Sequence, residues 1–280
     1  MEQKWDNIIQ PNKQLFNLNF KAIWKYKDLL MLFVRRDFVA NYKQTILGPT
    51  WFFIQPIFTS LVLTIVFGNM AALETDGIPK FPFYLAGVTI WGYFADCINK
   101  TSETFTVNQG LFGKVYFPRI IVPLSVVLTN MLKFVVQFIL FLCIWTYYYF
   151  TTDGIAANST MLLIPVFVIL MALMGLGLGM IISSMTTKYR DLKFLVSFGV
   201  QLMMYLSAVI IPLSSANGWM KKVMLVSPMT SIIESFKYSF FTKGSVPVGA
   251  LIYTAVFSVA VFILGMVIFN RVEKSFIDTV

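Results

Sequence analysis

The sequence predicts an all-α polytopic membrane protein with six transmembrane helices, and three observations support this fold class. Of the 280 residues, 58% are hydrophobic and 12% are charged, and the mean hydropathy is +0.75. A soluble domain carries about twice that charged fraction. Several apolar stretches reach the roughly 20 residues that a helix needs to cross a bilayer. Basic residues also alternate between the connecting segments, as expected for a chain that crosses a membrane repeatedly.

The apolar stretches divide the chain into a cytoplasmic amphipathic segment, residues 1–50, and a six-helix transmembrane domain, residues 51–280. The predicted spans cover residues of about 51–70, 83–105, 120–150, 161–187, 194–213 and 248–270. Four of these spans contain no charged residue. The second carries Asp96, Lys100 and Glu103, and the third carries Lys133.

The distribution of lysine and arginine predicts the orientation of the spans. Residues 1–50 hold eight basic residues, the five connections that follow hold 1, 3, 0, 3 and 4, with Lys100 near the end of the second span counted in the second connection, and the tail holds 2. The positive-inside rule then places both termini in the cytoplasm. The last connection, residues 214–247, is the exception, because it lies outside and yet carries Lys221, Lys222, Lys237 and Lys243. The net charge of +9 therefore reports orientation, and no nucleic-acid partner is expected.

The region from Phe16 to Phe38 predicts helices that lie in the membrane interface. A helical wheel groups the apolar residues of this region on one face. They are Phe16, Phe20, Ile23, Trp24, Leu30, Met31, Val34 and Phe38. Lys21, Lys25 and Arg36 lie opposite, where they can meet anionic headgroups. Leu29, Leu32 and Phe33 do not fit a single wheel, so two helices joined near Asp28 are expected. The alternative is a solvated basic tail.

Two absences limit the chemistry of the chain. It contains no histidine, which excludes histidine-based triads, and no metal site is expected. It also lacks a G-x-x-x-x-G-K-[ST] phosphate loop, so no nucleotide is expected to bind. The glycine-rich run at Gly175, Gly177 and Gly179 differs from a dinucleotide motif. Gly175, Gly179 and Ser183 instead fit the small-xxx-small pattern of closely packed membrane helices.

Two charged residues are predicted to lie within reach of each other in neighbouring antiparallel spans. Asp96 lies 13 residues in from the outer edge of its span and Lys133 lies 13 residues in from the inner edge of the next. For a hydrocarbon core of about 30 Å, their backbones then differ in depth by about 9 Å. Side chains lean toward the N-terminus of a helix, which brings these two toward each other. We expect an intramembrane charge pair, either structural or facing a pore.

The string RRDFVANYKQTILGPTWFFIQP, which begins at Arg35, resembles the N-terminal motif of permease subunits of ABC exporters of bacterial cell-surface polysaccharides. The matching positions are Arg36, Asp37, Tyr42, Lys43, Leu47, Gly48, Trp51 and Pro56. Residues 108–125, 188–194, 227–241 and 271–280 resemble further signatures of this type-2 ABC permease family, in the same order. One departure is Ser227, where the family usually has Asn. The resemblance covers essentially the whole chain.

This resemblance implies a transporter subunit rather than an enzyme. The permeases of this family act as homodimers on two copies of a separate ATPase, which binds ATP and Mg and hydrolyses the nucleotide. Residues around Arg36 and around Lys114 would dock on that ATPase. The expected docking residues are Arg36, Asp37, Tyr42, Lys43, Lys114, Tyr116, Phe117 and Arg119. The alternative for these segments is anchoring to the membrane surface by their basic residues.

The exceptional connection, residues 214–247, is explained by the same resemblance. In this family the corresponding segment folds back as re-entrant helices that form an outer gate, here including Pro212, Trp219 and Pro228. Irregular backbone at membrane depth requires cover by protein or a cavity. The four lysines of this segment would then face a channel or the outer headgroups.

The expected substrate is a lipid-linked polysaccharide of O-antigen, capsule or teichoic-acid type, exported across the bacterial inner membrane. Trp91, Tyr93 and Phe94 could line the substrate channel, because aromatic rings stack on sugars, or they could simply pack in the core. An ABC permease for a small hydrophobic molecule or drug is the alternative function.

Overall fold

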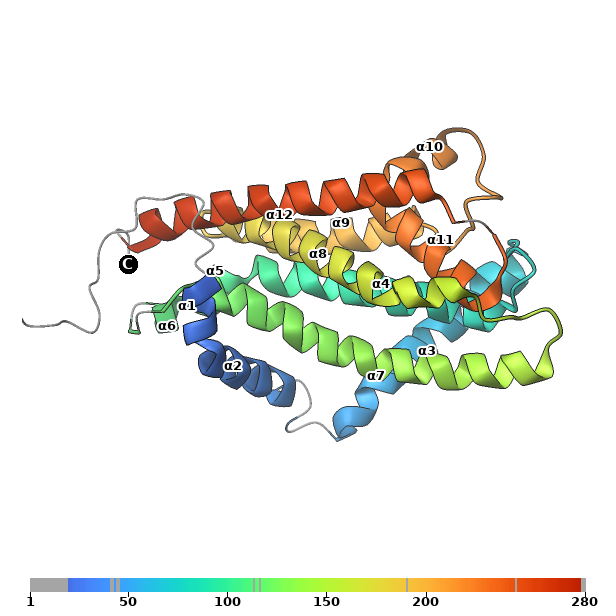
Figure 1. The fold of residues 1–280 in the computed structure, drawn as a ribbon, viewed down its shortest axis with the longest axis horizontal. Coiled ribbons are helices and arrows are strands. Elements are labelled where there is room, and N and C mark those ends of the chain that lie inside the picture. Colours follow the sequence, from blue (N-terminus) through green and yellow to red (C-terminus); the bar gives the residue numbers. More distant parts are fainter. Residues whose placement is uncertain are drawn as a thin grey trace, which may run out of the picture.

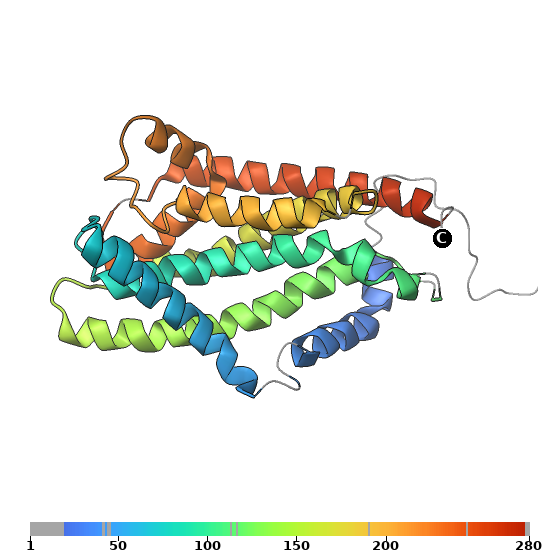
Figure 2. The ribbon, with the colours of Figure 1, turned by 180° about the vertical axis from the view of Figure 1, so that it is seen from behind.

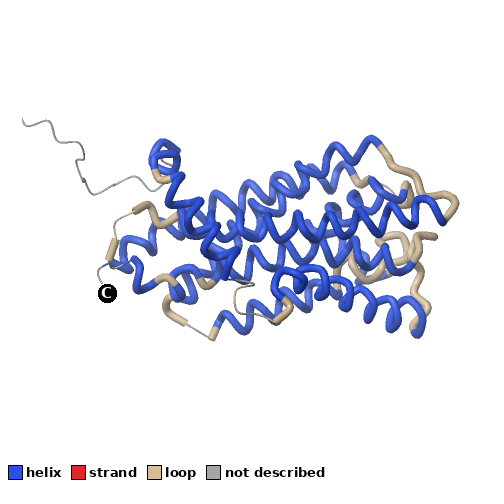
Figure 3. Tube along the Cα trace, turned by 90° about the horizontal axis from the view of Figure 1, so that it is seen from below, coloured by secondary structure: helices blue, strands red, loops and turns tan. Residues whose placement is uncertain are grey.

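We describe the protein from a computed structural model, in residues 20–40, 43, 46–112, 114–115, 117–189, 191–244 and 246–277. Every regular element in these ranges is a helix, as the tube in Figure 3 shows. The all-α fold class predicted from composition is confirmed at this level.

The helices vary in length from single turns to spans of about 30 residues. In chain order they are α1 (Phe20–Lys25), α2 (Lys27–Ala40), η1 (Gly48–Thr50), α3 (Trp51–Leu63), the π-helical η2 (Thr64–Met70), α4 (Lys80–Ser102), α5 (Thr104–Val107), α6 (Gln109–Phe112), α7 (Ile121–Thr151), η3 (Ser159–Leu163), α8 (Ile164–Thr186), α9 (Leu192–Tyr205), α10 (Gly218–Val226), α11 (Pro228–Phe241) and α12 (Val248–Ile277).

The long helices form an elongated bundle with two distinct ends (Figures 1 and 2). One end carries α1, α5, α6 and the last turns of α12, and we call it the terminal end. The other end carries α10, α11 and the connection from α7 to α8, and we call it the far end. Consecutive long helices run between the two ends in alternating directions.

Among the residues that the structure describes, four helical segments are long and apolar enough to cross a membrane. They are Gly48–Met70, Ile121–Thr151, Ser159–Thr186 and Val248–Val272. The protein is therefore a multi-pass membrane protein. α4 has 23 residues but carries Lys80, Asp96 and Lys100, and α9 has only 14 residues.

The fifth apolar stretch differs from the predicted continuous span 194–213. Its helix, α9, ends at Tyr205, and residues 206–217 form turns instead. The Ser207 hydroxyl donates to the Met204 carbonyl at 2.7 Å, which satisfies one of the carbonyls at the helix end. Pro212 cannot donate a backbone hydrogen bond, so it also opposes continuation of the helix.

The glycines of α8 form the packing surface that their spacing predicts. A Cβ atom on Gly175 would lie 2.7 Å from Cys97 Cβ of α4, and one on Gly179 would lie 2.5 Å from Thr101 Cβ. Gly177 faces the other way, and its Cβ would lie 2.7 Å from Phe262 Cα of α12. Without side chains at these positions, α8 approaches two helices closely at once.

The N-terminal helices α1 and α2 meet at Tyr26, close to the break expected near Asp28. α2 packs against α7 and buries Phe33 and Val34. Trp24 and Met31 of the predicted apolar face remain 74% and 61% exposed. Phe16 lies outside the described residues. The apolar face is thus divided between a contact with the bundle and an exposed surface.

Candidate functional site

The two segments expected to dock on an ATPase come together at the terminal end. Phe33 of α2 contacts Phe117 of the connection before α7 edge to face, with ring centroids 5.8 Å apart. Phe117 in turn lies 5.9 Å from Phe112 of α6. Because these rings are buried, the contact fixes α2 against the connection between α4 and α7.

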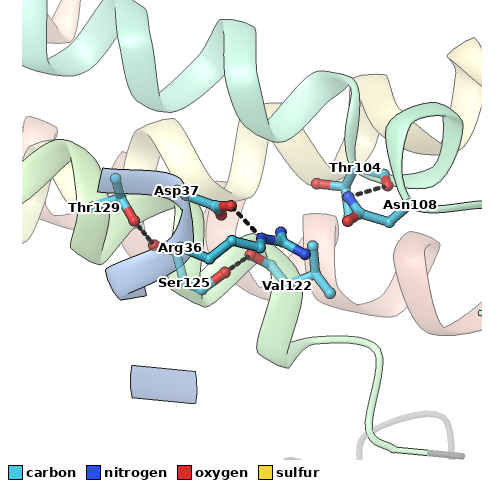
Figure 4. A network of polar contacts seen from close by, with 7 residues as sticks. All are labelled: Arg36, Asp37, Thr104, Asn108, Val122, Ser125 and Thr129. Carbon is cyan, nitrogen blue, oxygen red and sulfur yellow. Dashed lines mark hydrogen bonds and ion pairs between the residues drawn. The ribbon is translucent and has the colours of Figure 1, made fainter. Parts of the chain in front are cut away.

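Arg36 and Asp37 lie on α2 beside the first turns of α7. Arg36 Nε donates to Asp37 Oδ1 at 2.7 Å, and the Arg36 guanidinium lies 4.8 Å from the centre of the Phe33 ring. Figure 4 shows both side chains next to Val122 and Ser125 of α7. The Arg36 side chain is 47% exposed, so part of its guanidinium is free to contact another molecule.

The other expected docking residues fall into three groups. Lys43 and Lys114 are exposed. Arg119 and Phe117 are buried, with Arg119 8% exposed and 5.2 Å from the centre of the Phe112 ring. Tyr42 and Tyr116 lie outside the described residues. Arg119 therefore stabilises the connection from inside, while the exposed lysines leave positive charge on the surface.

An aromatic chain that the sequence did not reveal continues from this joint to α12. Phe112 contacts Phe105 at 5.9 Å, and Phe105 stacks on Phe269 of α12 at 4.5 Å. We call Phe33, Phe117, Phe112, Phe105 and Phe269 the aromatic joint. It links α2 to the last part of α12 through side chains up to 236 positions apart in the sequence. No local spacing could have indicated it.

The charged residues of the second and third apolar stretches meet between α4 and α7. Lys133 Nζ lies 2.6 Å from Asp96 Oδ2. Lys100, one turn further along α4, interacts electrostatically with Asp96, Lys133 and Asp37. The charges therefore form a group of two acids and two bases that reaches from the membrane-spanning region to α2. Asp37 and Lys100 were not recognised as part of it from the sequence.

The aromatic residues considered for a channel lie inside the protomer. Trp91, Tyr93 and Phe94 are 4%, 2% and 7% exposed. Trp91 contacts Phe94, with centroids 5.5 Å apart, and Tyr93 contacts Phe134 at 5.2 Å. Their burial fits the packing alternative, because a ring that lines a channel within this chain would need an exposed face.

The expected gate residues occupy different environments at the far end. Pro212 is buried, Pro228 begins α11, and Trp219 of α10 is 69% exposed. Of the four lysines in residues 214–247, Lys221, Lys222 and Lys243 are exposed, but Lys237 is 2% exposed. The expectation that all four face a channel or headgroups is wrong for Lys237. Its ammonium group instead donates to a backbone carbonyl inside the protein.

Comparison with known proteins agrees with this architecture. The chain is 26% identical over 263 residues to the O-antigen export system permease protein RfbA of Myxococcus xanthus, covering 93% of this chain and 98% of that protein. It is 24% identical to the protein of the same name from Klebsiella pneumoniae, over 90% of this chain and 94% of that one. It is 20% identical to the polysialic acid transport protein KpsM of Escherichia coli, over 87% and 93% respectively.

A family profile covers most of the chain as well. Residues 28–241 match the ABC-2 type transporter family, from the start of α2 to the end of α11. The match therefore includes the segments that are expected to dock on an ATPase, the charge pair, and the far-end segment as far as residue 241. The chain belongs to the ABC-2 type transporter family.

Proposed function

We propose that this chain is the permease subunit of an ABC exporter that moves a lipid-linked polysaccharide across the bacterial inner membrane. The observation that carries the proposal is the aromatic joint, which unites α2 and the connection before α7 at one end of a membrane-spanning bundle. Relatives over nearly the full length are named as permeases or transport proteins for O-antigen and polysialic acid.

In the proposed topology, α4 and α9 also cross the membrane, which gives six spans with both termini in the cytoplasm. α4 is long enough, at about 34 Å for its 23 residues. Its neighbours α3, α7 and α8 pack around it, and Asp96 pairs with Lys133 of α7 at 2.6 Å, which would lower the cost of placing these two charges in the membrane. α9 is shorter, at about 21 Å, and the turns of residues 206–217 complete its passage.

The terminal end would dock on a separate ATPase chain. Arg36, Lys43 and Lys114 offer exposed positive charge there. Phe33 and Phe117 would hold the two docking segments together, so that a movement imposed on one reaches the other. ATP and Mg would bind to the partner, because this sequence lacks a phosphate loop.

The functional unit would be a homodimer, with α9 at or near its interface. α9 has no buried side chain, whereas each other described helix of ten or more residues has at least one. Phe194, Phe198 and Leu202 recur on one face and are 70%, 61% and 44% exposed. A second copy that covers this face would bury apolar area and place the two 206–217 segments near a common axis.

The proposal is tested by purifying the tagged chain in mild detergent and identifying its partner. We expect an ATPase with a phosphate-binding loop to copurify. Lys114→Glu should reduce its recovery, whereas Lys222→Glu, an exposed lysine at the far end, should not. Equal loss in both variants, or no ATPase with the unmodified chain, would contradict the docking assignment.

The substrate class is tested separately by deleting the gene and analysing lipid carriers. We expect glycan-loaded carrier to accumulate inside the cell and surface polysaccharide to be lost. Normal surface polysaccharide combined with sensitivity to a drug would favour the alternative, export of a small hydrophobic molecule.

A further inference from the structure

Two charged side chains of α11 hold the two ends of an irregular stretch at the far end. Lys237 Nζ donates to the Ala208 carbonyl at 2.5 Å, and the Leu213 backbone N–H donates to Glu234 Oε1 at 3.2 Å. Glu234 and Lys237 are three positions apart, so they project from the same face of the helix. Together they bracket residues 208–213, directly after α9 ends.

Both charged groups are buried, which makes their contacts specific. Lys237 is 2% exposed and Glu234 is 7% exposed. The Lys237 ammonium also lies 3.2 Å from the centre of the Phe83 ring of α4, a cation–π contact. A buried ammonium or carboxylate that lost its hydrogen-bond partner would be strongly disfavoured, so each contact resists separation of α11 from residues 208–213.

The bracketed stretch is wedged against α4 on its other side. A Cβ atom on Gly87 of α4 would lie 3.1 Å from Val209 Cα. Ala208 and Val209 are fully buried. The stretch is therefore held between two helices, and it can leave only if the contacts with α11 break.

Two further carboxylates extend the same arrangement to the following residues. The Ser214 hydroxyl donates to Asp76 Oδ1 at 2.5 Å, and the Ser215 hydroxyl donates to Glu74 Oε2 at 3.1 Å. Both acids precede α4, in the connection from η2. These two hydrogen bonds are exposed, so they contribute less than the buried pair.

We propose that Glu234 and Lys237 are positioning residues that keep the far end of the transport path closed, by holding residues 206–217 between α11 and α4 until transport releases them. This inference rests on the proposed function, since a closed end requires a transport path. It assigns the closing contacts to two side chains whose partners are backbone groups of the chain.

Because the partners of Glu234 and Lys237 are backbone groups, the proposal can be distinguished from one in which the two side chains only neutralise each other's charge. Leu213 N–H requires an acceptor at position 234 and the Ala208 carbonyl requires a donor at position 237. Exchanging the two residues, Glu234→Lys with Lys237→Glu, keeps the net charge but places a donor against a donor and an acceptor against an acceptor. The exchange should therefore fail to restore closure.

The test measures how readily a cysteine within residues 206–217 reacts. Ala216 is 2% exposed, so Ala216→Cys reports its release, in a Cys143→Ser background that removes the exposed native thiol. Membranes containing the assembled transporter are treated with a membrane-impermeant maleimide from outside, without ATP. Glu234→Ala and Lys237→Met should each accelerate labelling about tenfold or more, since each leaves a buried partner unsatisfied.

Matched variants control for nonspecific damage. Lys243→Met removes an exposed lysine of the same region and should leave the labelling rate unchanged. If the alanine or methionine variants do not accumulate in the membrane, Glu234→Gln and Glu234→Asp decide instead. Gln keeps an acceptor at the same reach and should label more slowly than Asp, which keeps the charge but is one methylene shorter.

Three results would overturn the proposal: unchanged labelling in Glu234→Ala and Lys237→Met, slow labelling restored by the charge exchange, or slower labelling of Glu234→Asp than of Glu234→Gln. The labelling assay needs no polysaccharide. A wrong substrate assignment would therefore leave the labelling result unchanged. If instead Glu234 and Lys237 do not hold residues 206–217, the copurification and carrier assays would be unaffected.

Discussion

The two ends of the bundle differ in the contacts that hold their connecting segments in place, although each end also has both buried and exposed basic residues. At the terminal end, aromatic rings join α2 to the connection before α7, and Lys43, Lys114 and part of Arg36 stay exposed. At the far end, Glu234 and Lys237 are buried and bind the backbone of the same chain. Charge left free suits contact with another protein, and charge used internally suits closure. Under the proposed function, the terminal end would receive the partner and the far end would open.

The comparison assumes that the helical bundle between the two ends is stable. Loss of the Asp96–Lys133 pair is expected to have the largest effect on that stability. Asp96→Asn or Lys133→Met should each lower the free energy of unfolding by about 4 kcal/mol, because the remaining charge loses its partner inside the bundle. Thermal unfolding of the purified protein in detergent measures this change.

The double variant of this pair supplies the control. It removes both charges, so it should recover most of the lost stability. A double variant as unstable as either single variant, or less stable, would show that the two side chains do not act as a pair.

The apolar character of the terminal end predicts the next largest effect. Phe117→Ala should destabilise the aromatic joint by about 3 kcal/mol through lost packing, and α2 should become more accessible to protease. Phe117→Leu keeps most of the volume and serves as the control. Labelling of Ala216→Cys at the far end should stay slow in both variants. Fast labelling would mean that the two ends are not independent.

The close packing of α8 should give a smaller effect. Gly177→Ala forces α8 and α12 apart and should cost about 2 kcal/mol. Gly249→Ala adds the same methyl group in α12, where nothing lies within 4 Å, and should be close to neutral. Thermal unfolding of the two variants tests this difference, and equal stability would contradict the packing role of Gly177.

The smallest effect on stability is expected at the exposed lysines, although their effect on partner binding should be measurable. Lys114→Gln should change the free energy of unfolding by less than about 0.5 kcal/mol. It should nevertheless weaken ATPase binding. The difference in ATPase recovery between the variant and the unmodified chain should become smaller at high salt, because salt already screens the charge of Lys114 in the unmodified chain. A titration of salt during copurification measures this. Equal recovery of the ATPase with both proteins at low salt would contradict the assignment.

Much of the architecture could be predicted from the sequence, because crossing a membrane constrains the length, hydropathy and residue spacing of each helix. Three of the four uncharged stretches, about 51–70, 161–187 and 248–270, correspond to helices that are long enough to cross a membrane, and so does the predicted span 120–150, which carries Lys133. Spacing by four predicted that Gly175 and Gly179 form a close-packing face, and the structure shows that this face contacts α4. The depth calculation brought Asp96 and Lys133 within reach of each other, and their side chains lie 2.6 Å apart. Each of these predictions depends only on distance along a helix.

The remaining features depend on contacts between distant segments. The sequence placed the end of the fifth span at residue 213, but α9 ends at Tyr205 because α11 supplies hydrogen-bond partners for the released backbone. In the sequence, nothing distinguished Lys237 from the other three lysines of residues 214–247, which are exposed. Phe33 was noted only because it does not fit a single helical wheel. Their roles follow from partners 29 and 84 positions away.

The sequence by itself therefore determined that this protein crosses a membrane repeatedly, and which helices can approach closely, since length, hydropathy and residue spacing control both. Only the tertiary structure decided which charges are free and which are enclosed. The reason is physical: burial of a side chain depends on whichever element packs over it, and residues remote in the sequence supply that cover.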